Sequence, residues 1–398
     1  MTDIRPEELT LANWDMGGEP SRWAYRNAGQ LFSHVEVATA EPVAELELVE
    51  MESVGLFRLD TAAGPTLAES LARSPVDGLV VVHQGRIVYE RYPRMDAGDR
   101  HLLMSVSKVF VSTLIIILER RGELNVAEPI DRLIPELAGS GWSGVPVIDI
   151  LDMASGIACL EDEPGAYDDP HACFYQFEAT LGWRPARQSE AASTYDLVRG
   201  LPRHRRCGEA YEYTSVNTFV LTWLIERLTG SAFHEALGRE IWSRGGFEAR
   251  AQLCRSASGA PASHGGISTT LRDLARFGML FTPSRHRVFD DELVDDDHGI
   301  LVHARCRPRL LQPGGFGDRV LRAFGSDLPH CASGQWNFVW PDGDRFKGGF
   351  GGQGLYVSGA RDLVIAFVGT PAADGSVNGI RWICRPLAQA LFEARTAP

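Results

Sequence analysis

Apolar and polar positions alternate with two different periods along this chain. The strand-like period of two is clearest over residues 77–92, where two β-rich runs flank a His-Gln-Gly turn, and again over residues 354–368. Each of these segments predicts a β-hairpin. The helical period of about 3.6 residues predicts helices over the following ranges: 66–74, 147–154, 218–228, 233–242, 271–280 and 379–394.

The predicted strands lie toward the two ends of the chain, and the predicted helices fill most of the middle. This order predicts an α+β fold, in which an antiparallel sheet built from both chain ends is flanked by helices and carries an inserted, mainly helical lobe. We expect residues 1–104 to form a lead-in and the first strands of an α/β lobe, residues 105–255 the helical lobe, and residues 256–398 the remainder of the α/β lobe. Residues 157–208 show little periodicity, which is typical of a long binding loop.

One further predicted helix begins with a pair of reactive side chains. Residues 100–122 read as a short polar entry, an apolar helix and a stop at Gly122. Ser105 and Lys108 are three residues apart near its start, so a hydroxyl and an amine share one helix face. The first turn of a helix also offers free backbone N–H groups and the positive end of the helix dipole, which favour developing negative charge. This combination is what a nucleophilic serine requires.

The choice of lysine at position 108 supports that interpretation. The chain contains 39 Lys and Arg residues in total, and only Lys108 and Lys347 are lysines. Arginine cannot lose its proton near neutral pH, whereas a desolvated lysine can. A lysine in so arginine-rich a chain indicates that a titratable amine is needed beside Ser105. A surface lysine on a core helix is the alternative.

Composition and charge argue against several other classes of protein. A net charge of −13 without a basic stripe argues against a nucleic-acid-binding protein. The apolar run at 109–118 is too short to cross a bilayer, and residues 1–20 do not resemble a signal peptide. The seven cysteines are scattered and odd in number, so we expect reduced thiols and a cytoplasmic protein. Metal-binding spacings are absent and the acidic run at 290–297 predicts a solvated loop, so we expect neither a metal nor another cofactor.

Three motifs carry a resemblance to a known family. They are Ser105-Val-Ser-Lys108, Tyr213-Thr-Ser-Val-Asn217 ahead of a helix, and Gly351-Gly352-Gln353 ahead of the last hairpin. Their order and spacing resemble the serine β-lactamase and penicillin-binding-protein superfamily, in its class C and carboxylesterase branch. Within that branch the chain is most similar to the 6-aminohexanoate-dimer (nylon-oligomer) hydrolases, through residues 99–108, 150–153, 265–268 and 272–276. The resemblance implies a β-lactamase/transpeptidase-like fold.

The resemblance also implies roles for the matching residues. Ser105 would be the acylated nucleophile and Lys108 its proton partner. Tyr213 would be a second base, with its phenol made more acidic by Lys108. The backbone N–H groups of Ser105 and Gln353 would form the oxyanion hole.

Further residues would contact the substrate or orient the base. Ser215 would lie on the same side of an extended turn as Tyr213, with Asn217 two residues further on. Tyr167 resembles a tyrosine that closes over the substrate in the nylon-oligomer hydrolases, with an ordinary loop tyrosine as the alternative. His264 either lines the cleft or caps the next turn.

The third motif departs from the family pattern. Phe350-Gly351-Gly352 stands where β-lactamases have Lys-Thr-Gly and many esterases of the branch have His-Gly-Gly. A cation that could hold a substrate carboxylate is therefore missing there, and strand alternation predicts that Lys347 points elsewhere. From this difference we expect short uncharged esters to be better substrates than β-lactams.

The predicted function is a serine hydrolase that cleaves a small ester or amide through an acyl-enzyme on Ser105, without a cofactor. A β-lactamase or a D-Ala-D-Ala-type peptidase is the alternative among enzymes. A non-turnover acylatable sensor or an inactive structural relative is the alternative of a different class. The expected partner is a small-molecule substrate rather than nucleic acid or a membrane, and the sequence leaves the oligomeric state open.

Overall fold

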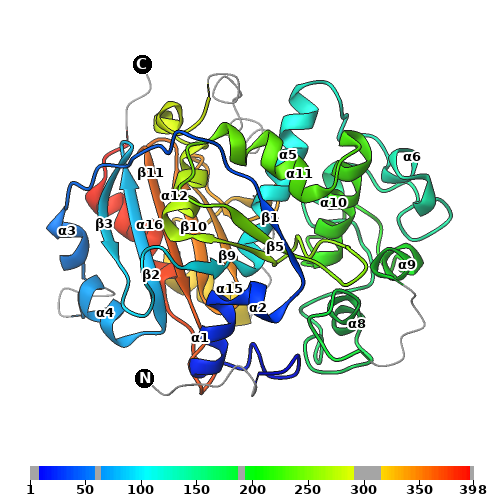
Figure 1. Cartoon of the computed structure of the whole chain (residues 1–398), viewed down its shortest axis with the longest axis horizontal. Helices are drawn as coiled ribbons and strands as arrows, with labels where there is room; N and C mark the ends of the chain where they lie inside the picture. The colour runs from blue at the N-terminus through cyan, green and yellow to red at the C-terminus, as the bar shows by residue number, and fades with distance from the viewer. Residues whose placement is uncertain (1–8, 59–63, 187–192, 291–314, 395–398) are drawn as a thin grey trace.

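The computed structural model describes residues 9–58, 64–186, 193–290 and 315–394. At its centre is a seven-stranded antiparallel sheet with the strand order β3-β2-β11-β10-β9-β8-β7 (Figure 1). The strands are β2 (Val76–His83), β3 (Arg86–Arg91), β7 (Cys331–Ser333), β8 (Trp336–Val339), β9 (Arg345–Gly349), β10 (Gln353–Ser358) and β11 (Leu363–Gly369). Both predicted hairpins are confirmed, because β2 pairs with β3 and β10 pairs with β11. Since β2 also pairs with β11, strands from the two parts of the chain share one sheet, as predicted.

Side-chain alternation explains why the predicted strands read as nearly continuous apolar runs. In β10, Leu355 and Val357 belong to one hydrophobic cluster, whereas Tyr356 between them belongs to another. In β11, Val364 belongs to the first cluster and Ile365 to the second. Successive side chains point to opposite faces of a sheet, and both faces of this sheet are covered.

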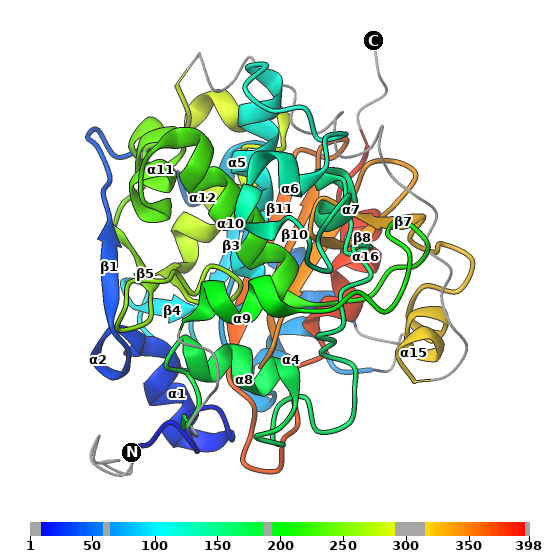
Figure 2. The ribbon, with the colours of Figure 1, turned by 90° about the vertical axis from the view of Figure 1, so that its right-hand side faces the viewer.

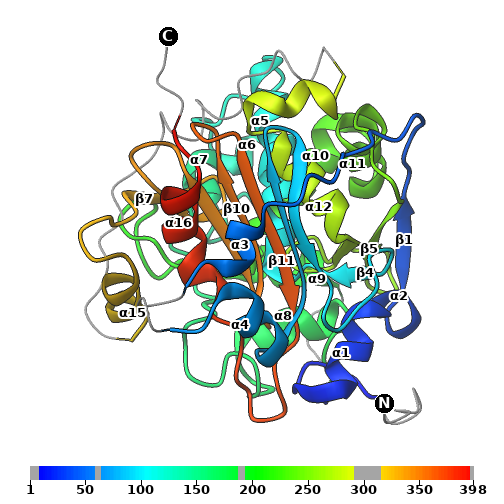
Figure 3. The same ribbon diagram turned by 90° about the vertical axis from the view of Figure 1, so that its left-hand side faces the viewer.

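Helices cover the two faces of the sheet. On one face lie α3 (Glu52–Leu56), α4 (Leu67–Arg73) and α16 (Ile380–Leu391), with α15 (Gly315–Phe324) packed beside α16 (Figure 3). The other face packs against α12 (Leu271–Met279). The helical lobe contains α5 (Lys108–Arg120), α6 (Ile130–Leu133), α7 (Val147–Leu151), α8 (Cys173–Thr180), α9 (Thr194–Gly200), α10 (Ser215–Thr229) and α11 (Phe233–Glu240) (Figure 2). The arrangement confirms the predicted α+β class.

A second, four-stranded sheet leads into the Ser105 segment. Its order is β1-β5-β6-β4, and its strands are β1 (His34–Val37), β4 (Arg100–Leu102), β5 (Ala251–Cys254) and β6 (Ile267–Thr270), with α1 (Gly18–Arg26) and α2 (Ala28–Leu31) nearby. The polar entry expected at the start of residues 100–122 is thus a strand, and only the expected first helical turn at Ser105 differs from the prediction. The start of this range forms a strand and a 3-10 turn, η2 (Met104–Ser107), because β4 pairs with β6 from a distant part of the chain.

Local signals mark the ends of several helices. Thr66 and Glu69 form a reciprocal capping box at the start of α4, with hydrogen bonds of 3.2 and 2.8 Å. Gly230 ends α10 with a left-handed φ of 63°. The same helix begins at Ser215, earlier than the predicted residue 218, so Ser215 and Asn217 are helical rather than extended.

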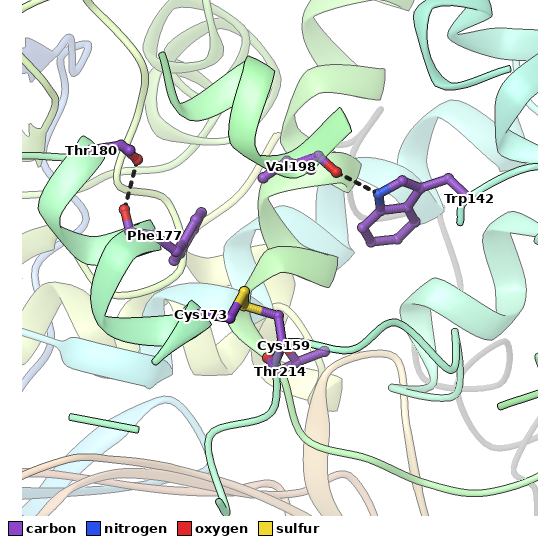
Figure 4. The surroundings of a disulfide bond; sticks show 7 residues. All are labelled: Trp142, Cys159, Cys173, Phe177, Thr180, Val198 and Thr214. Atoms are coloured by element: carbon purple, nitrogen blue, oxygen red, sulfur yellow. Dashed lines mark hydrogen bonds between the residues drawn. A yellow bond between two sulfur atoms is a disulfide. The ribbon is translucent and has the colours of Figure 1, made fainter. Parts of the chain in front are cut away.

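A disulfide bond joins Cys159 to Cys173, with a Cα separation of 5.2 Å (Figure 4), and Cys331 is also disulfide-bonded. The prediction of reduced thiols is wrong for these residues, because the fold of the 157–208 segment brings together cysteines that no spacing pattern marks. The cysteines therefore no longer support the predicted cytoplasmic location. The Thr214 hydroxyl donates to the Cys159 carbonyl, so the disulfide is anchored beside the start of α10.

The sequence predicts neither a membrane-spanning helix nor a metal site. No helix in the described part of the chain is long and apolar enough to span a membrane. The described residues also contain no group of three or more His, Cys, Asp or Glu side chains that could hold a metal ion. Of the acidic run at 290–297, residues 291–297 lie outside the described residues.

Candidate active site

Ser105 lies in a tight turn between β4 and α5. The backbone enters this turn through Met104, whose left-handed φ of 48° costs a non-glycine residue roughly 1–2 kcal/mol. Strand β9 packs against the turn, where a Cβ atom on Gly349 would lie 2.7 Å from the Leu103 carbonyl oxygen. Only glycine therefore lets β9 approach the serine so closely.

Lys108 begins α5 and is completely buried. Its Nζ lies 3.0 Å from Ser105 Oγ and 2.9 Å from the carbonyl oxygen of His264. Because a carbonyl only accepts hydrogen bonds, one N–H of the amine donates to it, and this contact orients the nitrogen toward Ser105. Burial lowers the pKa of Lys108 from 10.5 to about 8, while the carboxylates of Glu161 and Glu178 limit the decrease. The predicted pair of a hydroxyl and a titratable amine is present.

Tyr213 completes this group. Its ring lies beside the amine, with Lys108 Nζ 5.1 Å from the ring centroid. Burial raises the pKa of the phenol well above its ordinary value of 10.0, and the negative charge of Glu161 raises it further. The predicted acidification by Lys108 is therefore wrong. A phenol with so high a pKa keeps its proton near neutral pH, whereas the Lys108 amine, with a pKa of about 8, can lose one.

The second lysine also faces Tyr213. Lys347 is fully buried in β9, and its Nζ donates to the Tyr213 hydroxyl at 3.4 Å and lies 5.0 Å from the ring centroid. The predictions that Lys347 points elsewhere and that the third motif lacks a cation are both wrong. The reason is the strand register: Lys347 pairs with Leu355 of β10, whose side chain lies on the sheet face toward the helical lobe.

Phe350 begins the turn after β9 and does not occupy a cation site. Its side chain is 44 % exposed and stacks on Tyr167 with ring centroids 6.0 Å apart. Gly351 lines the pocket and has a left-handed φ of 87°. Gly352 follows with a φ of 101°, and a Cβ atom there would lie 2.2 Å from the Asn378 amide nitrogen. Both glycines thus shape the turn that carries Phe350.

Gln353, whose backbone N–H is the predicted oxyanion-hole donor, is not among the residues that line the pocket. Its side chain is fully buried, and its Nε2 donates to the Gly369 carbonyl at 3.0 Å. Gly349 and Phe350 line the pocket beside Ser105 instead. The role expected for the Gln353 backbone N–H stays a prediction, since β10 as well as β9 lies against the Ser105 turn. In the described part of the chain, the Phe350 N–H donates to no other backbone group.

A buried carboxylate that sequence analysis did not identify faces the same pocket. Glu161 is 7 % exposed and accepts hydrogen bonds from the Tyr167 hydroxyl at 2.8 Å and from Ser215 Oγ at 2.5 Å. Its backbone N–H donates to the Tyr213 carbonyl at 3.3 Å. Tyr167 therefore lines the pocket. No spacing marked Glu161, because its partners are distant in the sequence and it lies within the unpatterned segment 157–208.

Ser215, Asn217 and His264 lie beneath the pocket. Ser215 and Asn217 are fully buried, and the Asn217 amide donates to the Met153 sulfur at 3.5 Å. The structure contradicts their predicted contact with substrate, because the helix that starts at Ser215 directs both side chains inward. The buried His264 ring neither lines the pocket nor caps a turn, and it packs among Phe174, Phe177 and Trp183. Its contribution to the site is the carbonyl that holds Lys108.

The pocket beside Ser105 has a volume of roughly 670 Å³, which suits a small molecule. Charged groups in its lining include Glu161 and Asp162 from one segment and Arg381 from α16. Its apolar lining is supplied mainly by Met16, Phe338, Phe346, Phe350, Pro371 and Val377. The site thus combines a serine, a buried amine and a largely apolar cavity.

Comparison with known proteins places these residues in context. A family model described as Beta-lactamase matches residues 66–376. The 6-aminohexanoate-dimer hydrolase of Paenarthrobacter ureafaciens is 34% identical over 276 residues, which are 69% of this chain and 67% of that protein. A solved structure from Bacillus anthracis, assigned as a candidate 6-aminohexanoate-dimer hydrolase, matches with a TM-score of 0.79 at 20% identity over 98% of both chains. The octameric penicillin-binding protein homologue of Pyrococcus abyssi matches with a TM-score of 0.56 at 14% identity, over 82% of this chain and 76% of that chain. At these identities the two structural matches concern the fold alone.

Proposed function

Because this chain belongs to the beta-lactamase family and is a serine hydrolase, we propose that it cleaves an ester or amide bond through an acyl-enzyme on Ser105. The observation that carries the proposal is the 3.0 Å contact between Ser105 Oγ and Lys108 Nζ at the pocket. A neutral amine at that distance is within reach of the hydroxyl proton. The pKa of Lys108, lowered to about 8, makes the neutral amine available near physiological pH.

In the acylation step, Ser105 Oγ attacks the substrate carbonyl carbon and its proton passes to the Lys108 amine. The backbone N–H groups of Ser105 and Phe350 would stabilise the resulting oxyanion. Collapse of this intermediate breaks the bond to the leaving alcohol or amine. The Tyr213 phenol donates its proton to the leaving group. The proton held on Lys108 then passes to the Tyr213 oxygen and restores the phenol.

Water completes the cycle by attacking the acyl carbonyl, and its proton follows the same route in reverse. Ser105 regains its proton and the carboxylic acid is released. Negative charge passes through the Tyr213 oxygen during these transfers. Lys347 donates to that oxygen at 3.4 Å and would stabilise the charge.

Intact-protein mass spectrometry after addition of p-nitrophenyl butyrate or a fluorophosphonate tests this proposal. We expect a single adduct that maps to Ser105, with fast loss of the butyryl group and a stable phosphonyl group. An acyl group that persists would indicate a sensor instead. Failure to label, or labelling that survives in Ser105→Ala, would refute the assignment of Ser105.

For the substrate, we propose a short linear amide with an apolar spacer. A relative at 34% identity is named for the 6-aminohexanoate dimer, and the pocket lining of this chain offers aromatic and aliphatic surface to a methylene chain. Chromatography would show release of 6-aminohexanoate from the linear dimer. Turnover of p-nitrophenyl butyrate without any cleavage of the dimer would restrict the activity to esters.

The position of Lys347 favours β-lactam hydrolysis as a second candidate. It brings a cation to the Ser105 group, where sequence analysis had expected none. A chromogenic cephalosporin and p-nitrophenyl butyrate can be compared on one preparation. Comparable kcat/KM values would favour a β-lactamase, whereas a cephalosporin value about a hundredfold lower would favour the ester or amide hydrolase.

A further inference from the structure

Solvent-exposed apolar side chains gather around one pocket of this protein. Among the described residues, eight large apolar side chains are exposed, and four of these eight line the pocket that contains Ser105. Single exposed apolar residues are ordinary, whereas a group of them around one cavity marks a binding surface. We call the four side chains the apolar rim, and they are Met16, Tyr167, Phe350 and Val377, which are 70, 39, 44 and 47 % exposed.

Ring stacking and a close backbone approach connect one half of the apolar rim. Phe350 stacks on Tyr167 with ring centroids 6.0 Å apart. The next residue, Gly351, lies against Pro371, because a Cβ atom on Gly351 would be 3.0 Å from Pro371 Cδ. Pro371 is buried and also lines the pocket, so apolar surface continues from Phe350 to this proline.

The other half of the apolar rim adjoins the same proline. The Gly18 N–H donates to the Pro371 carbonyl at 2.8 Å, which brings the segment that carries Met16 to this position. Val377 belongs to the loop that follows Pro371, and a backbone hydrogen bond of 2.8 Å between residues 372 and 376 closes that loop. The rim side chains come from separate segments of the chain and border one pocket.

The apolar rim is continuous with the apolar interior of the pocket. Phe338 and Phe346 line the same cavity as Ser105, so a linear hydrocarbon chain whose carbonyl lies at Ser105 stays on apolar surface as far as the rim. A chain that covered the rim would remove exposed apolar surface from water, which favours binding. A compact polar substrate would leave this surface uncovered.

We infer that the apolar rim binds a linear hydrocarbon chain of the substrate, so that the enzyme prefers esters or amides with a chain of about eight carbons over those with about four. The inference rests on the proposed function, since the chain belongs to a substrate cleaved at Ser105. Complete burial of one methylene group strengthens binding about fourfold, and a rim that covers only one side of the chain should strengthen it about twofold. Four additional methylene groups therefore favour the longer chain roughly 10–20-fold.

Two series of neutral esters test the inference, because the chain can belong to either side of the cleaved bond. p-Nitrophenyl butyrate and p-nitrophenyl octanoate differ in the acyl chain, whereas butyl acetate and octyl acetate differ in the alcohol chain. The measured quantity in each series is the ratio of kcat/KM for the longer ester to kcat/KM for the shorter ester. Concentrations are kept below those at which the longer ester aggregates.

The double variant Met16→Ser/Val377→Ser removes two rim side chains, and Leu56→Ser/Val49→Ser is its matched control. Leu56 and Val49 are 63 and 44 % exposed and lie outside the pocket lining, so the control removes similar apolar surface elsewhere. In at least one series we expect the wild-type ratio to be roughly 10–20, and the rim variant to lower it about 3–10-fold, mainly through KM. The control should keep the wild-type ratio. Ratios in the rim variant that equal the wild-type ratios in both series, or an equal loss in the control, would overturn the inference.

A binding measurement separates this inference from the proposed function. Octyl methyl ketone and butyl methyl ketone carry a carbonyl but are not cleaved, so calorimetry reports on the rim even if Ser105 is never acylated. We expect the octyl ketone to bind the wild type about tenfold more tightly than the butyl ketone, and to lose most of this advantage in the rim variant. Equal affinities of the wild type for the two ketones would refute the inference, whatever the outcome of the acylation experiment. A smaller sedimentation coefficient in the rim variant, with unchanged ester ratios, would overturn it in favour of a contact between two copies of the chain.

Discussion

The buried amine of Lys108 makes the pH dependence of acylation a sensitive test of the mechanism. With a pKa of about 8, roughly a tenth of Lys108 is neutral at pH 7 and roughly nine tenths at pH 9. At its ordinary value of 10.5, only about 0.03 % would be neutral at pH 7. Burial therefore increases the amount of usable base about 300-fold, and kcat/KM should rise nearly tenfold between pH 7 and pH 9.

The assay is kcat/KM for p-nitrophenyl butyrate between pH 6 and pH 10, corrected for spontaneous hydrolysis. A neutral ester is chosen because its own charge does not change over this range. Stopped-flow measurement of the first turnover separates acylation from deacylation, so the inflection can be assigned to the acylation step.

The chain contains two lysines, so two variants assign the inflection. Lys108→Arg keeps the charge but cannot accept a proton, and it should abolish the inflection near pH 8 together with several orders of magnitude of activity. Lys347→Met removes the donor to Tyr213 and should lower the rate, but the inflection should remain. A flat wild-type profile, an inflection near pH 10, or loss of the pH 8 inflection in Lys347→Met alone would refute Lys108 as the base.

Three further outcomes follow from the same contacts. Ser105→Ala should fold, because alanine suits a helical turn better than serine, and should retain at most a few per cent of ester turnover; greater turnover would reveal another nucleophile. Lys108→Met should raise the free energy of unfolding at pH 7 by about 2 kcal/mol. Keeping Lys108 buried with its lowered pKa costs the folded wild type roughly 3 kcal/mol at that pH, and the hydrogen bonds that the variant loses contribute about 1 kcal/mol in the opposite direction. The unfolded chain binds more protons between about pH 8 and 10.5, so wild-type stability should rise with pH across that window in denaturant titrations, and an equal rise in Lys108→Met would contradict this account. Replacing both Cys159 and Cys173 by alanine should lower the free energy of unfolding by roughly 3 kcal/mol and raise KM by loosening the segment that carries Tyr167; stability equal to that of the oxidised wild type would argue against the bond.

Features that depend on neighbours in the sequence could be predicted. The two hairpins have alternating or continuous apolar strands about short turns, and α4 and α10 end in recognisable caps. The contact between Ser105 and Lys108 also follows from local geometry, because three residues of a helical turn bring their side chains together.

Features that depend on distant pairing could not be predicted. Strand β4 exists because it pairs with β6, so its residues read only as a polar entry ahead of a helix when the sequence is read alone. Glu161 acquires its role from Tyr167 and Ser215, which only the folded segment brings to it. A motif match also could not show that Gly349 and Phe350, rather than Gln353, line the pocket beside Ser105.

The scarcity of lysine was a stronger signal than strand alternation. Arginine supplies all but two of the 39 basic residues, and both exceptions lie against Tyr213. In the proposed mechanism arginine would fail at position 108, because it cannot take up the Ser105 proton. At position 347 the planar guanidinium of an arginine would need two acceptors side by side. The Tyr213 hydroxyl offers a single oxygen, which suits the compact ammonium of a lysine. The rarity of lysine therefore marks Lys347 as strongly as Lys108, whereas strand alternation places a side chain only once the register of the strand is known.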